Sequence, residues 1–440
     1  MHRARPVPSR RHRSSRLDIM AQTPGSPAAG ESHAENMRVL QIEKFIDSSG
    51  AIAGGVGRYV RTLTELLKSQ GHSVLNFGCA GRAGPAGMPK YFDFTATRNP
   101  LALLKLIHNR QAAACLDKFL QANPVDVAHV HNIYHHLTPS IFPVLARHGV
   151  GVVMTVHDYR LACPTKFFLR RSGVCTRCLG NKFWHAASPR CAGAGGVALA
   201  VESWCNSLLG RYGRFVDTFL CPTEYMCDVL RRTGLAREQI SLLPNPVEFP
   251  RESPQEVSAG GYVLFAGRVS PEKSPEMMIE IARRLPQARI IIAGDGPVWP
   301  QLREQLDKSP LDNVTLPGHV GSAEMALLYA GASAVVITSR WMENSPAVML
   351  EALAQARPII APSHPPLREW ITDGVTGRLF PPGDAEQLAR VVGELLDDAT
   401  QARRLGQAGR ELVLARHDSD KILQAIERFY ERATQRCALR

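Results

Sequence analysis

From residue 37 onward, short apolar runs of strand length alternate with longer segments in which apolar residues recur every three or four positions. The first unit has an apolar run over residues 38–45, the glycine-rich sequence 54–57, and an amphipathic segment that ends at Gly71. Strands that alternate with helices in this way form parallel sheets. We therefore predict a doubly wound α/β domain, with further strands at residues 72–76, 125–130, 151–156 and 218–221.

A second series of the same kind follows the proline-rich stretch 243–246 and the polar residues 250–260. Because single hydrophobic cores stop growing at about 250–300 residues, a chain of 440 residues is expected to form two domains. We predict two Rossmann-like, doubly wound domains that face a cleft. The second has expected strands at 262–266, 289–293, 314–316, 334–338 and 358–361, and the chain is expected to end in helices near 385–397, 400–415 and 419–434.

The composition, with 45% apolar and 21% charged residues, is typical of a folded protein. No apolar run reaches the roughly 18 residues that a membrane-spanning helix needs, so we expect none. The formal net charge of +12 is compatible with nucleic acid, anionic lipid or phosphorylated ligands, and by itself does not choose among them.

Residues 1–36 are rich in arginine, proline, glycine and serine. Such a stretch buries too little apolar surface to order itself, and it lacks the apolar segment of a secretory signal. We expect either a disordered basic arm or an over-extended start, with Met37 as the first residue of the fold. An arm that lies on a membrane surface is the functional alternative.

The most specific chemical signal follows the expected strand 334–338, where the loop 339–346 leads into a helix that carries Glu351. Backbone amides at a helix start can hold a sugar or phosphate oxygen. A carboxylate further along the helix can accept hydrogen bonds from a ribose diol. The alternative is that Glu343 and Glu351 are two ordinary charges on a solvated helix.

Two further motifs come directly after strands of the second domain. Arg268 and Lys273 follow the strand 262–266, where they can neutralise a diphosphate. The turn formed by Gly294, Asp295 and Gly296 lets the backbone approach a ligand closely. Surface cations and a tight turn are the plain alternatives.

Together with Gly267 and the sequence 373–377, these motifs resemble the donor half of the retaining glycosyltransferases of family 4, which have the GT-B fold. The loop that begins at Trp341 resembles the members that build bacterial exopolysaccharide or lipopolysaccharide. The resemblance implies that Arg268 and Lys273 bind the donor diphosphate and that Glu351 holds the ribose. It implies that Glu343 and the following residues Asn344, Ser345 and Pro346 meet the donor sugar.

The amino-terminal half resembles the family less sharply. Gly55 and Gly57 belong to a sequence that is similar to the family's glycine-rich loop, which approaches the donor phosphate and the acceptor. A dinucleotide-binding motif is the alternative, but Val60 stands where that motif has its last glycine, and Asn76, at the expected end of the second strand, is not an acid.

Several histidines follow the expected strands of the first domain. His157 comes after the strand 151–156, and the resemblance places it near the hydroxyls of the donor sugar; a structural histidine is the alternative. The crowded residues His129, His131, Asn132, His135 and His136 are interpreted as surface or acceptor-contacting groups, with a metal site as a further alternative.

The resemblance also implies the division of the chain and its chemistry. We expect an acceptor-side domain over residues 37–243, a donor domain over 244–415, and a helix over 416–440 that crosses back to the first domain. No metal is expected at the phosphates and no cofactor is required for catalysis. The expected partners are a UDP- or GDP-linked sugar as donor and a glycan or lipid-linked acceptor, and no nucleic acid. We expect a cytoplasmic protein with peripheral contact to an anionic membrane at its inner face. A sugar-nucleotide epimerase and a catalytically silent binding subunit are the alternatives.

Cys163, Cys175, Cys178 and Cys191 form a cysteine-rich insertion over residues 163–191. Four thiolates with one Cys-x-x-Cys pair can hold a structural zinc ion, and a reducing compartment favours metal over disulfides. We predict a structural zinc site. An iron–sulfur cluster and free thiols remain as alternatives.

Overall fold

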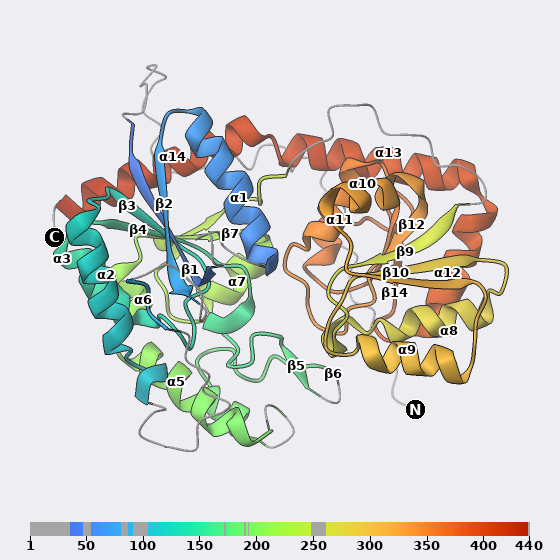
Figure 1. Ribbon diagram of the computed structural model, residues 1–440, viewed down its shortest axis with the longest axis horizontal. Coiled ribbons are helices and arrows are strands. Elements are labelled where there is room, and N and C mark those ends of the chain that lie inside the picture. Colours follow the sequence, from blue (N-terminus) through green and yellow to red (C-terminus); the bar gives the residue numbers. More distant parts are fainter. Residues whose placement is uncertain are drawn as a thin grey trace, which may run out of the picture. The chain divides into compact units, whose positions relative to one another are not determined.

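The computed structural model describes residues 36–46, 54–80, 87–90, 104–170, 173–188, 191, 193–247 and 261–438. The basic stretch 1–36 lies almost wholly outside these ranges, so the expectations for it are not tested by the structure. Two parallel six-stranded sheets, each flanked by helices, dominate the described part of the chain (Figure 1). They confirm the predicted α/β class.

The first sheet has the strand order β2-β1-β3-β4-β7-β8 and is parallel throughout. The strands are β1 (Arg38–Ile46), β2 (Ser73–Ala80), β3 (Val127–Val130), β4 (Gly151–Thr155), β7 (Thr218–Cys221) and β8 (Ile240–Leu242). The helices that belong to this part are α1 (Gly54–Ser69), α2 (Arg110–Ala122), α3 (Phe142–Arg147), α5 (Gly196–Leu208), α6 (Arg211–Phe215) and α7 (Glu224–Arg231).

The second sheet has the order β11-β10-β9-β12-β13-β14 and is also parallel. The strands are β9 (Tyr262–Ala266), β10 (Arg289–Ala293), β11 (Val314–Gly318), β12 (Ala332–Val336), β13 (Ile359–Pro362) and β14 (Arg378–Phe380). Its helices are α8 (Glu276–Arg284), α9 (Trp299–Lys308), α10 (Ser322–Gly331), α11 (Ala347–Ala354), α12 (Ala385–Asp397) and α13 (Ala399–Arg416), and the last helix is α14 (Ser419–Ala438).

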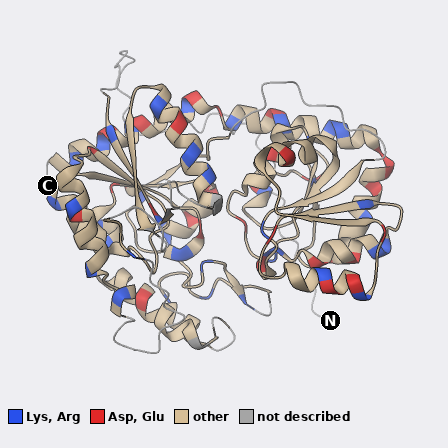
Figure 2. Ribbon diagram, viewed as in Figure 1, with Lys and Arg blue, Asp and Glu red and all other residues tan. Residues whose placement is uncertain are grey.

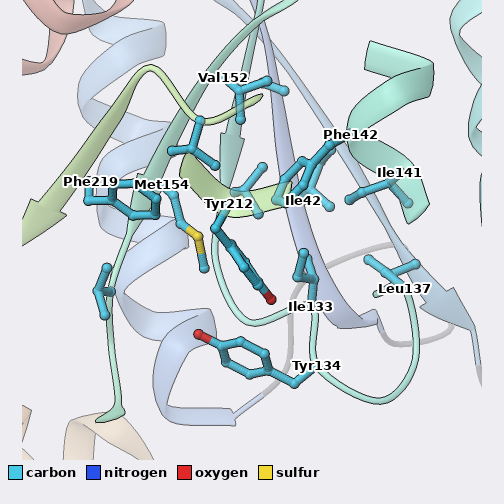
Figure 3. Close-up of a cluster of buried hydrophobic side chains, with 14 of the residues drawn as sticks. Ile42, Ile133, Tyr134, Leu137, Ile141, Phe142, Val152, Met154, Tyr212 and Phe219 are labelled. Atoms are coloured by element: carbon cyan, nitrogen blue, oxygen red, sulfur yellow. The ribbon is translucent and has the colours of Figure 1, made fainter. Parts of the chain in front are cut away.

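The central strands of each sheet are buried on both faces, which explains why they are largely apolar. In β4, Val152 and Met154 belong to one apolar cluster, whereas Val153 between them belongs to another on the opposite face. In Figure 3, Met154 and Phe219 from neighbouring strands lie with Tyr212 of α6 in the first of these clusters. The alternation of side chains along a strand assigns each residue to one of the two cores.

The last helix packs on the first sheet, although the helix before it packs in the second half of the chain. Ile426 and Tyr430 of α14 share an apolar cluster with Val39 and Val153, whereas Val413 of α13 lies in a core of the second half. A Cβ atom on Gly151 would lie 2.6 Å from the backbone of α14. Glycine at the start of β4 therefore permits this close approach.

Several boundaries differ from the prediction. The strand expected at 72–76 runs from Ser73 to Ala80, so Asn76 lies inside it and does not end it. The strand expected at 334–338 is β12, which ends at Val336. Ile337 and Thr338 are still buried, so burial does not reveal where the strand stops. The three-residue strands β8 and β14 were not predicted, because they are too short to show a period.

The short antiparallel pair β5 (Leu169–Arg170) and β6 (Gly173–Val174) lies in the cysteine-rich insertion. In the part of the chain that the structure describes, no helix is long and apolar enough to span a bilayer.

Candidate functional site

A cavity of about 500 Å³ lies between the first turns of α1 and the helices α10 and α11. From the first half of the chain it is lined by α1 and by His157, which follows β4. From the second half it is lined by Ser345, Glu351 and the inner side of α10. The structure thus brings His157, Ser345 and Glu351 to one cavity, as the sequence predicts for a site between two domains.

Glu351 is already engaged at the wall of this cavity. Its carboxylate contacts the guanidinium of Arg58 from α1 and accepts a hydrogen bond of 2.9 Å from the hydroxyl of Tyr329 on α10. Burial and the neighbouring carboxylate raise the pKa of Tyr329 well above its ordinary value, so this hydroxyl stays a donor. A ribose that binds Glu351 would share or replace these two partners.

Ser345 and Pro346 stand at the start of α11. Pro346 occupies the N-cap position of α11, and its side chain makes no capping hydrogen bond to the first turn of this helix. The hydroxyl of Ser345 is buried and has no hydrogen-bond partner among the described atoms. A buried polar atom without a partner costs about 1–3 kcal/mol. A ligand oxygen in the cavity is a suitable partner for it.

Glu343 lies in a separate polar cluster and does not line the cavity. It is buried, and its Oε1 accepts hydrogen bonds from the Ser339 hydroxyl at 2.6 Å and from the Trp341 indole at 3.0 Å. Lys273 forms an ion pair with the same oxygen, and its ammonium lies 5.8 Å from the centroid of the Trp341 ring. The structure thus pairs two residues for which the sequence predicted separate contacts with the donor.

Arg268 is exposed at the end of β9, and it does not line the 500 Å³ cavity. Gly267 has a φ of +129°, a conformation that residues with a Cβ rarely adopt. A Cβ atom on Gly294 would lie 1.8 Å from the carbonyl oxygen of Gly267. The amide of Val269 also donates to the carbonyl of Asp295 at 3.0 Å. The glycines of the turn 294–296 are thus required for the contact between two backbone segments, a constraint that the sequence prediction did not include.

The predicted glycine-rich loop is instead the first turn of a helix. α1 begins at Gly54, so Gly55 and Gly57 are helical residues. Residues 47–53, which precede them, lie outside the described ranges. The amides of a first helical turn have no partner within the helix, so a ligand can still reach them. The two residues that follow, Arg58 and Tyr59, line the cavity.

His157 is the last of three polar side chains that contact one another in series. Its Nε2 lies 3.0 Å from Nδ1 of His131, whose Nε2 lies 2.7 Å from Oε1 of Gln41. The ring of Tyr59 stands edge-on to His157 at 4.8 Å between centroids. Burial, and to a smaller degree Lys44, lowers the pKa of His157 to about 3. The ring is therefore neutral at neutral pH and can exchange hydrogen bonds with a hydroxyl group, but it carries no charge.

Three other histidines of this group, His129, His131 and His136, are buried, so the interpretation of them as surface groups is wrong. His129 contacts the Tyr430 hydroxyl and the Thr155 hydroxyl, each at 2.7 Å. Burial lowers the pKa of His129 to about 3. His129 thus joins the first sheet to α14, and both of its ring nitrogens are used within the protein.

Asn344 joins the two halves of the chain. Its side-chain amide donates to the carbonyl of Val156 at 3.1 Å and accepts from the Thr223 hydroxyl at 2.8 Å. The same threonine caps α7. The Asn344 side chain is thus engaged by protein atoms, so only its backbone is left for the predicted contact with a donor sugar.

The sequence prediction missed Arg58, Tyr59 and Tyr329, which line the cavity. Arg58 and Tyr59 directly follow the glycines that were singled out, so the start of α1 could have indicated them. Tyr329 lies on α10, which carries no motif, and only the fold brings it to Glu351.

The four cysteines of the insertion lie around a second cavity, of about 150 Å³, together with His185. Burial and the neighbouring thiols of Cys163, Cys191 and Cys175 raise the pKa of Cys178 to about 12. Among the described residues, no group of three or more His, Cys, Asp or Glu side chains is arranged to hold a metal ion. The zinc site stays a prediction.

Comparisons with known proteins agree with this architecture. The family model described as "Glycosyltransferase Family 4" matches residues 53–251, and the model described as "Glycosyl transferases group 1" matches residues 248–412. The fold is similar to that of HepE from Anabaena, with a TM-score of 0.60 and 18% identity over 89% of this chain and 99% of that one.

Two named relatives differ in how much they share with the chain. An alpha-D-kanosaminyltransferase of Streptomyces kanamyceticus is 32% identical over 35% of this chain, and the match spans only 41% of that protein. A glycogen synthase of Mycobacterium tuberculosis is 25% identical over 90% of this chain and 94% of its own length. With adjoining family models that extend from residue 53 to residue 412, the chain belongs to the family 4 glycosyltransferases with the GT-B fold.

Proposed function

We propose that the protein is a retaining glycosyltransferase, which moves a sugar from a UDP- or GDP-linked donor to a glycan or lipid-linked acceptor in exopolysaccharide or lipopolysaccharide synthesis. The observation that carries this proposal is the 500 Å³ cavity lined by His157, Ser345 and Glu351. It combines a carboxylate, an unpartnered hydroxyl and a neutral imidazole at the contact of two parallel-sheet domains.

The donor class has support from the relatives. HepE is known in complex with UDP and with UDP-glucose, and two relatives are named as an alpha-D-kanosaminyltransferase and a glycogen synthase. In the proposed complex, Glu351 accepts hydrogen bonds from the ribose diol, and the amides at the start of α11 face the donor sugar.

Lys273 and Arg268 are proposed to neutralise the departing diphosphate without a metal ion. Lys273 would then exchange Glu343 for a phosphate oxygen or bridge the two. Glu343, which is held by Ser339 and Trp341, would position both the lysine and the donor sugar. Arg268 is exposed, and its long side chain would close over the diphosphate when the donor is bound.

His157 is proposed to bind a hydroxyl of the donor sugar in its neutral form. The acceptor hydroxyl would attack the anomeric carbon from the side of the leaving group, its oxygen would form the new glycosidic bond, and its proton would pass to the departing phosphate. The carbon–oxygen bond to the nucleoside diphosphate breaks in the same step, so atoms and charge balance. Closure of the two halves of the chain around the donor would exclude water and so limit hydrolysis of the donor.

The first experiment is a thermal-shift screen of the full chain against UDP, GDP and their common sugar conjugates. A ligand at 100 times its Kd stabilises the protein by about 2.7 kcal/mol. We expect a shift with one nucleotide class, loss of the shift in Glu351→Ala, and no loss in Glu386→Ala, which removes an exposed carboxylate outside the cavity.

Turnover separates the remaining alternatives. Release of the nucleoside diphosphate that depends on a glycan or lipid-linked acceptor, with the anomeric configuration of the donor kept in the product, supports the proposal. Conversion of the donor to an epimeric sugar nucleotide without an acceptor would identify an epimerase. Binding without either reaction would identify a silent subunit.

A further inference from the structure

Six of the large apolar side chains that the described residues leave exposed gather on or beside α5. Four of them, which we call the α5 stripe, are Val197, Val201, Trp204 and Leu208, with exposed fractions of 58%, 45%, 52% and 68%. Leu209 directly after the helix and Trp184 in the cysteine-rich insertion are exposed by 53% and 61%. Solvent-exposed apolar side chains in such a cluster mark an interaction surface.

The spacing of four, three and four residues places the α5 stripe on one side of the helix. The opposite side is packed within the protein. Ala200 shares a small apolar cluster with Phe183 and Ala186 of the insertion, and Glu202 and Asn206 are buried. The stripe is therefore an outward face that none of the described residues covers.

The chain around α5 is strongly basic. Residues 159–216 contain a single acid, Glu202, which is buried in an ion pair with Arg160. Glu202 is also the only charged residue of α5, and Figure 2 shows that α5 lies at the edge of the first half, with basic positions on the elements beside it. The basic residues of the stretch are Arg160, Lys166, Arg170, Arg171, Arg177, Lys182, Arg190, Arg211 and Arg214.

We propose that the α5 stripe docks on an anionic lipid bilayer, with α5 lying in the plane of the interface. A helix with an apolar face and basic surroundings binds this way, since its apolar side chains enter the headgroup region while lysine and arginine attract anionic lipids. Tryptophan is enriched at this depth. A second copy of the chain is a poorer partner, because two surfaces with the same excess of positive charge repel each other.

The docking surface explains how a lipid-linked acceptor would reach the first half of the chain, and this part of the inference rests on the proposed function. The binding of the α5 stripe to lipid is independent of the proposed function. The insertion holds α5 through Phe183 and Ala186, so the cysteine-rich segment supports the helix that carries the stripe.

The test is co-sedimentation of the full chain with vesicles of phosphatidylcholine alone or mixed with phosphatidylglycerol. The variant Trp204→Glu/Leu208→Glu places two carboxylates on the stripe, and Leu327→Glu is the matched control at an exposed leucine of α10. We expect binding to the anionic vesicles, with affinity reduced about tenfold or more in the double variant and unchanged in the control. Tryptophan emission of the wild type should shift to shorter wavelength with anionic vesicles, and less so in the double variant.

Three outcomes would overturn the proposal. Equal binding by wild type and double variant would assign lipid binding elsewhere, for example to the basic residues 1–36. A dimer that the double variant dissociates would make the stripe a protein interface. Absence of binding to either vesicle would exclude the docking surface, and a retained thermal shift with the donor nucleotide would show that the proposed function still holds.

Discussion

The substitution Lys273→Met removes the ammonium group and distinguishes what the Lys273–Glu343 pair contributes to stability from what Lys273 contributes to donor binding. Glu343 has a side chain that is 4% exposed, and Lys273 has one that is 24% exposed. Loss of one partner of a buried pair costs about 3–5 kcal/mol. Here the carboxylate keeps the Ser339 hydroxyl and the Trp341 indole, so we expect a loss of about 2–3 kcal/mol.

That loss corresponds to a decrease in Tm of roughly 5–10 °C for a domain of this size. The double variant Lys273→Met/Glu343→Gln removes the unpaired charge, and its amide oxygen can still accept from Ser339 and Trp341. We expect it to regain most of the lost stability, since residues in direct contact couple by about 0.5–3 kcal/mol.

Donor binding should respond differently. If Lys273 contacts the diphosphate, its loss removes a hydrogen bond to a charged group, worth about 1.5–3 kcal/mol, and Kd for the nucleotide rises about 10- to 150-fold. Glu343→Gln cannot restore a missing cation, so the double variant should bind as weakly as Lys273→Met. Thermal unfolding and isothermal titration calorimetry measure the two quantities. If Kd stays unchanged in Lys273→Met, Lys273 is a structural residue only; if stability does not recover in the double variant, the pair is not coupled.

Three further predictions concern His157, the cysteines and acid stability. Because the pKa of His157 is lowered to about 3, we expect the initial rate between pH 5.5 and 8 to show no inflection from this ring. His157→Phe should lower kcat about 10-fold or more. An inflection near pH 6.5 that disappears in the variant would contradict a neutral role for His157. Metal analysis of the purified protein should find zinc in a one-to-one ratio, lost in Cys175→Ser/Cys178→Ser and retained in Cys115→Ser; a metal-free wild type would show that the thiols of the insertion are free. Burial lowers the pKa of His129, His157 and His417 to about 3, 3 and 4, so as pH falls below 6.5 the unfolded chain binds protons that the folded chain does not. Each such histidine lowers the free energy of unfolding by up to about 1.4 kcal/mol per pH unit. Glu43 has the opposite effect, because burial raises its pKa to about 8 and its protonation in the folded protein stabilises the fold as pH falls from that value to the ordinary range of a glutamate. Tm should therefore decrease from pH 6.5 to pH 5, and a Tm that is constant or rises would refute the buried neutral histidines.

The sequence predicted the sheets well because strands buried on both faces are continuous apolar runs. The limits of β7, β9, β10 and α12 agree with the prediction residue for residue. Errors occurred at the end of β12, where buried residues continue past the strand, at the end of β2, where the strand continues past the expected residue 76 to Ala80, and in strands of three residues. The period and hydrophobicity of a sequence indicate which residues are buried, whereas the end of a strand is set by its hydrogen bonds to the neighbouring strand.

At the candidate site, local motifs identified residues but not their partners. The sequence by itself determined that chemically suitable side chains follow the strands: Glu343 and Glu351 around one helix start, and His157 after β4. Only the tertiary structure decided that Glu343 is paired with Lys273, that Glu351 faces Arg58, and that Asn344 bonds to the other half of the chain. The physical reason is that a motif fixes distances along a few residues of backbone, while these partners are separated by up to 293 positions and meet only where two sheets and their helices have packed.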